Sequence, residues 1–212
     1  MSDETRWWWI RHAPVVNPGN HIYGQNEIAC DVSDRMLFQR LAQALPADAV
    51  WLTSPLGRAR ETAQAILEKL PPPPPEPGIE PALLEQSLGD WQGMTHAELM
   101  RARAEALHRF WLAPAAEAPP GGESFVEVVA RVREAVERLS AAHRGRDIVA
   151  VSHGGTIRAA LAVALAVEPE RALSFTVDNC AITRLDHLAE GAGAHAPGVA
   201  AWRVQQVNAF PT

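Results

Sequence analysis

The chain has 212 residues, of which 47% are hydrophobic and 21% are charged, and its formal net charge at pH 7 is −6. This length predicts a single domain, residues 1–212, with enough apolar sequence to bury a core without disulfides. The acidic balance argues against nucleic acid as a partner, because nonspecific binding to phosphate backbones depends on positive charge. The two cysteines lie far apart, which indicates neither a disulfide scaffold nor a zinc site.

No segment has the pattern of a membrane span or of an export signal. The longest apolar stretch without a charge, Ala159–Val167, has nine residues, whereas a helix that crosses a membrane needs about 20. The apolar run near the N-terminus is interrupted by Arg11 and is too short for the core of a signal peptide. We therefore expect a cytoplasmic protein that does not contact a membrane.

Apolar runs typical of strands alternate with amphipathic segments typical of helices. In the first part of the chain, the predicted order is strand Trp7–Ile10, helix Asp34–Leu45, strand Ala49–Thr53, helix Pro55–Leu70 and strand Ile79–Leu84. Ser54 and Pro55 resemble an N-cap followed by proline at the first helical position. The five prolines from Pro71 to Pro75 end this helix.

The second part of the chain continues the alternation. Its predicted order is helix Met94–Leu112, helix Phe125–Leu139, strand Asp147–Ser152, helix Thr156–Val167, strand Ala181–Leu185 and strand Ala200–Val207. Ser124 and Glu127 form an S-x-x-E capping box before the second of these helices. The whole pattern predicts an α/β fold, a three-layer α/β/α sandwich with a mostly parallel central sheet. Functional side chains are then expected where strands end.

Several predicted strands end in residues that suit phosphate chemistry. Arg11 and His12 follow the first strand, Arg58 lies one turn into the helix after the second, and His153 follows Asp147–Ser152. Glu85 follows the third strand. A guanidinium group matches the oxygens of a phosphate, and the glycine pair that begins at Gly154 lets backbone N–H groups approach an anion.

The order of these motifs resembles the histidine phosphatase superfamily, which has the phosphoglycerate-mutase-like fold. The resemblance rests on five segments between Trp7 and Leu161: Arg11-His12, Ser54–Ala63, Leu84-Glu85 with Gly89–Gly93, Gly121–Ser124 and Ser152–Arg158. It implies that residues 86–122 form a small cap insertion within the domain. It also implies a hydrolase that needs no cofactor and no metal and acts on a small phosphorylated metabolite.

The resemblance assigns a role to each matching residue. His12 matches the nucleophile that accepts the phosphoryl group, and Glu85 matches the general acid. The phosphate pocket is matched by Arg11, Arg58 and His153, with the Gly154 backbone as a further substrate-binding group. Ala13 and Pro14 depart from the glycine and polar residue usual after the Arg-His pair, and proline removes a backbone donor there. Asn17 lies one residue before the position of the family's asparagine and is a candidate for phosphate binding.

Three alternatives remain open from the sequence. A phosphoglycerate-type phosphomutase would use the same phosphohistidine, but only 37 residues separate Glu85 from Glu123, fewer than the longer insertion typical of mutases in this family. A serine esterase of the α/β-hydrolase type would use Ser152, in a near match to G-x-S-x-G. The carboxylate of its catalytic triad would be Asp178 or Asp186, and the histidine would be His187 or His195. The departure at Ala13 and Pro14 also allows a noncatalytic phosphate-binding protein.

Within the superfamily, the short length and the Gly-Gly-Glu-Ser motif resemble phosphatases related to α-ribazole phosphatase. The resemblance therefore implies α-ribazole 5′-phosphate as a candidate substrate. A homodimer is the base-rate expectation for the assembly, because two-fold dimers are the commonest oligomers.

Overall fold

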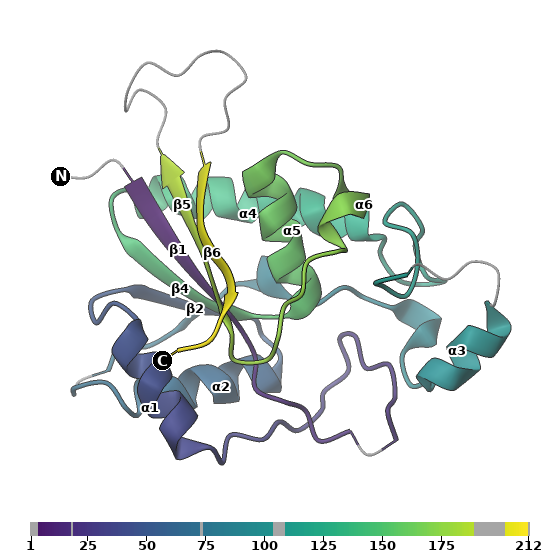
Figure 1. Cartoon of the computed structure of the whole chain (residues 1–212), viewed down its shortest axis with the longest axis horizontal. Coiled ribbons are helices and arrows are strands. Elements are labelled where there is room, and N and C mark those ends of the chain that lie inside the picture. The colour runs from purple at the N-terminus through teal and green to yellow at the C-terminus, as the bar shows by residue number, and fades with distance from the viewer. Residues whose placement is uncertain (1–3, 18, 73, 104–108, 189–201, 212) are drawn as a thin grey trace.

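The computed structural model describes residues 4–17, 19–72, 74–103, 109–188 and 202–211. A mixed sheet with strand order β3-β2-β4-β1-β5-β6 forms the centre of the molecule (Figure 1). The strands are β1 (Glu4–Arg11), β2 (Val50–Thr53), β3 (Gly78–Ile79), β4 (Asp147–Ser152), β5 (Ile182–Leu188) and β6 (Trp202–Ala209). The pairs among β1 to β4 are parallel, whereas β5 runs antiparallel to both β1 and β6. The predicted α/β fold with a mostly parallel sheet is confirmed.

Helices cover both faces of the sheet and make two separate cores (Figure 1). The helices are α1 (Arg35–Ala44), α2 (Gly57–Leu67), α3 (His96–Ala102), α4 (Phe125–Ala142), α5 (Gly154–Leu165) and α6 (Pro169–Ala172). Trp7 and Trp9 of β1 face the core made with α4 and α5, whereas Trp8 and Ile10 face the core made with α1 and α2. Because both faces of β1 are buried, its sequence is continuously apolar rather than alternating.

The predicted strand Ile79–Leu84 is wrong beyond its first residue. β3 contains only Gly78 and Ile79, and a 3-10 helix, η1 (Pro81–Leu83), follows it. Pro81 cannot donate a hydrogen bond to a strand ladder, and the Glu80 carboxylate accepts the Ala82 amide at 3.1 Å, which caps the short helix instead. The sheet therefore ends early, and the chain turns toward Glu85.

The predicted helix Met94–Leu112 is confirmed only in part. Among the described residues of this range, α3 alone is helical: Thr95 is its N-cap, Glu98 completes the capping box, and the helix ends at Ala102. Residues 104–108 lie outside the described part of the chain, and residues 109–112 are irregular. A further 3-10 helix, η2 (Gly89–Trp91), precedes α3.

The remaining predicted elements agree with the structure to within a few residues, whereas α6 has no predicted counterpart. The predicted capping box at Ser124 and Glu127 begins α4. α2 begins at Gly57 rather than at Pro55, with Leu56 at the N-cap position, and α5 begins two residues before Thr156. The last predicted strand, Ala200–Val207, is β6, although residues 200 and 201 lie outside the described ranges.

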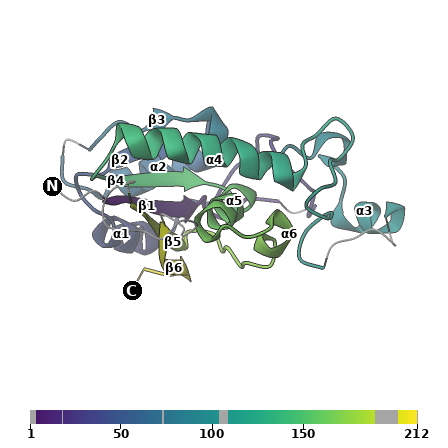
Figure 2. The same cartoon turned by 90° about the horizontal axis from the view of Figure 1, so that it is seen from above.

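The segment around α3 lies at one end of the molecule, beyond the ends of α4 and α5 (Figure 2). It has its own small apolar cluster, distinct from the two cores beside the sheet and made of Ile22, Leu88, Trp91, Leu99 and Ala113. The division of the domain into a body and a cap at residues 86–122 stays a prediction. Among the described helices, none combines the length and the apolar character that a membrane crossing requires.

Candidate active site

The carboxyl ends of three neighbouring strands bring the two predicted histidines together. β1 and β4 place Arg11 opposite Ser152, and the His12 amide donates to the Ser152 carbonyl at 2.9 Å. β2 lies on the other side of β4 and ends one residue before Ser54. The imidazole centroids of His12 and His153 are 5.1 Å apart, and His153 Nε2 lies 2.7 Å from Ser54 Oγ.

The His12 imidazole is buried, with 1% of the residue exposed, and is held in one orientation. Its Nδ1 lies 2.7 Å from the Ala13 carbonyl oxygen, a contact that places the proton on Nδ1 and leaves a lone pair on Nε2. Asn179 Nδ2 donates to the His12 carbonyl at 2.7 Å. Burial lowers the pKa of His12 to about 3, and the charges of Arg58 and Arg11 act in the same direction. The ring is therefore neutral near pH 7, the form that acts as a nucleophile.

Backbone carbonyls fix the two arginines of the site. Arg11 Nη1 donates to the Val177 carbonyl at 2.6 Å. Arg58 donates from Nη1 and Nη2 to two carbonyls of loop 24–26, at 3.0 and 2.6 Å, and has no exposed surface. Burial lowers the pKa of Arg58. Both guanidinium groups are thus held in place by neutral acceptors, which leaves their charge available to an anion.

Three buried N–H donors of the site have no hydrogen-bond partner among the residues that the structure describes. They are Arg11 Nε, Arg58 Nε and His153 Nδ1. Burial also holds the pKa of His153 well below its ordinary value, so its ring is neutral, and Nδ1 carries the proton when the Ser54 hydroxyl donates to Nε2. An unpaired buried donor costs about 1–3 kcal/mol. Three of them beside His12 indicate a ligand with several acceptor oxygens.

Glu85 lies against the N-terminus of α5. Its Oε1 accepts the Gln86 amide at 2.9 Å and the Gly155 amide at 3.0 Å. A Cβ on Gly155 would lie only 2.3 Å from Oε1, so this approach requires glycine. The Gly155 amide thus binds the Glu85 carboxylate rather than facing an open anion site, and the role of the Gly154 backbone in substrate binding stays a prediction.

A cavity of about 420 Å³ opens beside this group. Three predicted residues line it, namely Arg11, Glu85 and Gly154, and Tyr23 and Arg158 also face it. The Arg58 guanidinium lies 5.0 Å from the centre of the Tyr23 ring, which connects the arginine to the cavity wall. The cavity wall thus carries Glu85 and three arginines, Arg11, Arg109 and Arg158. Arg11 and Gly154 on this wall are the chain neighbours of His12 and His153.

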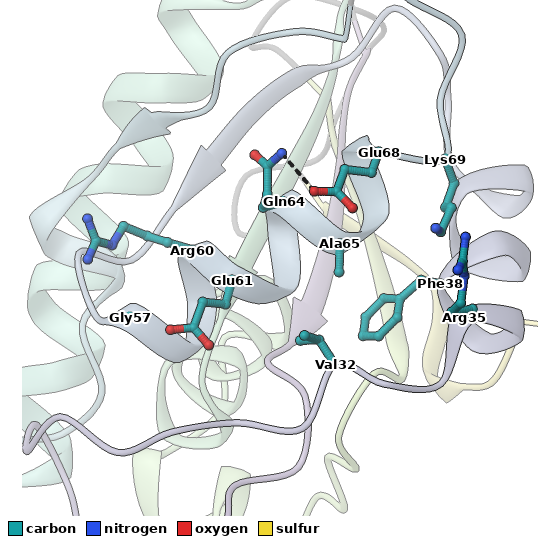
Figure 3. A pocket seen from close by; sticks show the side chains of 10 residues that line it. All are labelled: Val32, Arg35, Phe38, Gly57, Arg60, Glu61, Gln64, Ala65, Glu68 and Lys69. Atoms are coloured by element: carbon teal, nitrogen blue, oxygen red, sulfur yellow. Dashed lines mark hydrogen bonds between the residues drawn. The ribbon is translucent and has the colours of Figure 1, made fainter.

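A larger cavity, of about 660 Å³, lies elsewhere, in the groove between α1 and α2 (Figure 3). Its floor is apolar, and its rim carries side chains of both charges, including a Gln64–Glu68 hydrogen bond of 3.3 Å. None of the predicted site residues lines this groove. Size alone would therefore have placed the site on the wrong side of the molecule.

Comparison with known proteins agrees with this arrangement. The family model described as "Histidine phosphatase superfamily (branch 1)" matches residues 7–197. The chain belongs to the histidine phosphatase superfamily. The superfamily resemblance expected from the motifs is thereby confirmed.

Several superfamily relatives are informative. A bifunctional protein of Mycobacterium tuberculosis is 33% identical over 144 residues, which are 68% of this chain but only 38% of that protein. The glucosyl-3-phosphoglycerate phosphatase of Mycolicibacterium vanbaalenii is 36% identical over 182 residues, covering 80% of this chain and 75% of the relative. A 2,3-bisphosphoglycerate-dependent phosphoglycerate mutase of Gloeobacter violaceus is 32% identical over 145 residues, covering 68% and 66% of the two chains.

Solved superfamily structures have the same fold. The native mycobacterial glucosyl-3-phosphoglycerate phosphatase superposes with a TM-score of 0.79 at 29% identity, over 97% of this chain and 99% of the other. The α-ribazole phosphatase of Shigella flexneri gives a TM-score of 0.74 at 26% identity, over 98% of each chain.

Two further features of the superfamily motif take a different form here. Asn17 is half-buried, and both ends of its amide bond the backbone of His21, so it closes a loop and does not line the cavity. Its role in phosphate binding stays a prediction. The Pro14 carbonyl accepts the Asp31 amide at 2.7 Å, so this departure from the family pattern joins two loop segments. No group of three or more His, Cys, Asp or Glu side chains within the described ranges is arranged to hold a metal ion.

The geometry does not support the serine esterase alternative. Ser152 has no exposed surface, and its hydroxyl donates to the Leu83 carbonyl at 2.8 Å. Asp186 is buried and accepts from Arg184 at 3.0 Å. His195 lies outside the described residues. The near match to G-x-S-x-G therefore marks a buried strand end rather than an exposed nucleophile.

Sequence reasoning missed three residues of the site. Asn179 contacts the His12 backbone, Tyr23 packs against Arg58, and Arg158 lines the cavity. Asn179 precedes a predicted strand, but only the antiparallel pairing of β5 with β1 brings it to His12. Arg158 stood inside a quoted motif, and its spacing from Gly154 in a helix was the available signal.

Proposed function

We propose that this chain is a phosphomonoester hydrolase that works through a phosphohistidine at His12. The observation that supports the proposal most strongly is the position of the neutral imidazole beside three unpartnered donors, Arg11 Nε, Arg58 Nε and His153 Nδ1. A phosphoryl group offers three oxygens to such donors, and positive charge stabilises the charge on those oxygens during transfer. The lone pair on His12 Nε2 then attacks phosphorus.

The reaction balances in two steps. In the first, His12 Nε2 forms a bond to phosphorus, the bond from phosphorus to the alcohol oxygen breaks, and Glu85 gives its proton to that oxygen. In the second, Glu85 takes a proton from water, the water oxygen attacks phosphorus, and the N–P bond breaks to restore neutral His12. The Ala13 carbonyl, 2.7 Å from Nδ1, stabilises the positive charge that the ring carries in between.

Hydrolysis is preferred over mutase chemistry because the segment between Glu85 and Glu123 is short. A mutase must hold its intermediate away from water until a second hydroxyl accepts the phosphoryl group. The mutase alternative is also tested, because a phosphoglycerate mutase is 32% identical in sequence to this chain. Interconversion of 3-phosphoglycerate and 2-phosphoglycerate without net release of phosphate would favour the mutase.

The proposed substrate is a small phosphorylated metabolite, with α-ribazole 5′-phosphate as the specific candidate. The structural similarity to an α-ribazole phosphatase supports this choice. Glucosyl-3-phosphoglycerate enters the same panel because a relative of higher identity is named for it. We also propose a cytoplasmic location and a homodimer, the latter to be tested by analytical ultracentrifugation.

The decisive test compares wild type with His12→Ala in phosphate release from this panel, in excess chelator. His143→Gln, at the C-terminal end of α4, is the matched histidine control. The mechanism is supported if wild type and the control release phosphate and His12→Ala does not. An acid-labile phosphoryl adduct, trapped when the wild-type reaction is quenched in alkali, also supports it. Turnover that survives in His12→Ala would sink the role of His12, and turnover that chelator abolishes would sink metal independence.

A further inference from the structure

Arg158 is held rigidly at the wall of the cavity that contains Glu85. It lies in the second turn of α5, its Nε donates to the Phe175 carbonyl at 2.8 Å, and its guanidinium lies 4.7 Å from the centre of the Trp111 ring. Trp111 is itself fixed, because its Nε1 donates to Gln86 Oε1 at 2.8 Å. A stacked and bonded guanidinium keeps two Nη groups for a ligand and loses little freedom when it binds one.

The charge of Arg158 has no carboxylate partner within the described ranges. Burial lowers its pKa to about 10, which still leaves it a cation at pH 7. The two carboxylates that act on it electrostatically are Glu85 and Asp178. Glu85 accepts from backbone amides at the start of α5, and Asp178 accepts Asn208 Nδ2 at 2.8 Å. A half-buried cation that forms no ion pair with the described residues favours an anionic group in the cavity.

Arg158 lies next to the phosphate pocket but is not part of it. A Cβ on Gly154 would lie 3.1 Å from Arg158 Nη1 and 3.7 Å from Arg11 Nε, so the two arginines flank this glycine. The arginines whose charges lower the pKa of His12 are Arg58 and Arg11, and Arg158 is not among them. A phosphoryl group on His12 would therefore engage Arg11 and leave Arg158 to another part of the substrate.

We propose that Arg158, stacked on Trp111, binds an anionic group on the leaving-group part of the substrate, a carboxylate being the best fit to its two free Nη groups. This assignment rests on the proposed function, because it takes the phosphoryl group to lie at His12. It predicts that, between the two named substrates, glucosyl-3-phosphoglycerate, whose leaving group carries a carboxylate, is preferred to α-ribazole 5′-phosphate, whose leaving group carries no negative charge. The guanidinium fork and the carboxylate then form a paired, charge-assisted contact.

The test uses pairs of esters that differ only at the second group. 3-Phosphoglycerate is compared with glycerol 3-phosphate, and O-phosphoserine with phosphoethanolamine. Wild type is expected to prefer the carboxylate member of each pair by about tenfold to 100-fold in kcat/KM. Arg158→Gln should bring this ratio close to one. Arg133→Gln, which removes an exposed arginine from α4, is the matched control for loss of one positive charge and should keep the ratio.

A binding experiment separates this inference from the proposed function. Calorimetric titration of His12→Asn with each ester should show the same preference, and the double variant with Arg158→Gln should lose it. Turnover without any preference would overturn the role of Arg158 and leave the hydrolase intact. If the carboxylate esters bind more tightly but wild type turns over none of the esters, the role of Arg158 stands and the hydrolase function is overturned. An equal loss for both members of a pair in Arg158→Gln would also overturn the proposal, because it would mean that Arg158 holds the phosphoryl group or only the fold.

Discussion

Acidification should destabilise this protein through His12. The folded pKa of His12 is about 3, mainly because the ring is buried, whereas an imidazole in an unfolded chain titrates near about 6.5. A group whose pKa is lowered on folding contributes its full stability above the unfolded pKa and loses it as the pH falls toward the folded value. At pH 5 the unfolded chain binds a proton at this site and the folded chain does not, a difference of about 2 kcal/mol. His153 shifts in the same direction.

Urea unfolding at pH 7.5 and at pH 5, in buffers without phosphate, measures this loss directly. The free energy of unfolding of His12→Asn should fall by about 2 kcal/mol less between the two pH values than that of wild type. His96→Asn, at an exposed position, should follow wild type. An equal fall in wild type and His12→Asn would refute the reasoning, because it would show that His12 binds its proton in the folded state as readily as in the unfolded one.

Three further substitutions test other contacts of the site. Asn179→Ala removes the donor to the His12 carbonyl and should lower kcat by about five- to tenfold and unfolding free energy by about 1 kcal/mol; unchanged kcat in steady-state assays would contradict its positioning role. Gly155→Ala places a Cβ against the Glu85 carboxylate and forces it from its place. Phosphate release from an alkyl ester should then fall by about 100-fold or more, and release from an aryl ester should fall less, because an aryl leaving group needs no proton. Equal losses for the two esters would argue against an acid role for Glu85. Ser152→Ala should leave phosphatase activity within about threefold of wild type, because losing a buried hydroxyl bond costs stability rather than chemistry; abolished turnover would revive the serine alternative.

The sequence predicted the parts of this protein that depend on local pattern. The buried strand of Trp7–Ile10, the capping box at Ser124 and the helix after the glycine pair each follow from periodicity or capping chemistry. Because parallel strands end at one edge of a sheet, strand-end residues could be grouped into one candidate site. His12 and His153 do meet there, with their rings 5.1 Å apart.

What the sequence could not show depends on contacts between distant segments. The apolar spacing in residues 94–112 resembles a helix. In the described part of this range, however, α3 ends at Ala102, Leu99 packs in a small separate cluster, and Trp111 lines the cavity. Arg158 has the same helical neighbours whether it faces solvent or the cavity. Only the position of Trp111, 47 residues earlier in the chain, decides between these outcomes.

The change of strand direction between β1 and β5 brings the segment before β5 to His12. Because β5 runs against β1, the loop before β5 arrives at the carboxyl end of β1, where Val177, Asn179 and Cys180 bond the side chain or backbone of Arg11 and His12. The register of β5 against β1 therefore decides whether these contacts reach His12. A slip of β5 by one residue would carry them away from the proposed nucleophile, so selection for activity should preserve the pairing of a strand that contributes no reacting atom.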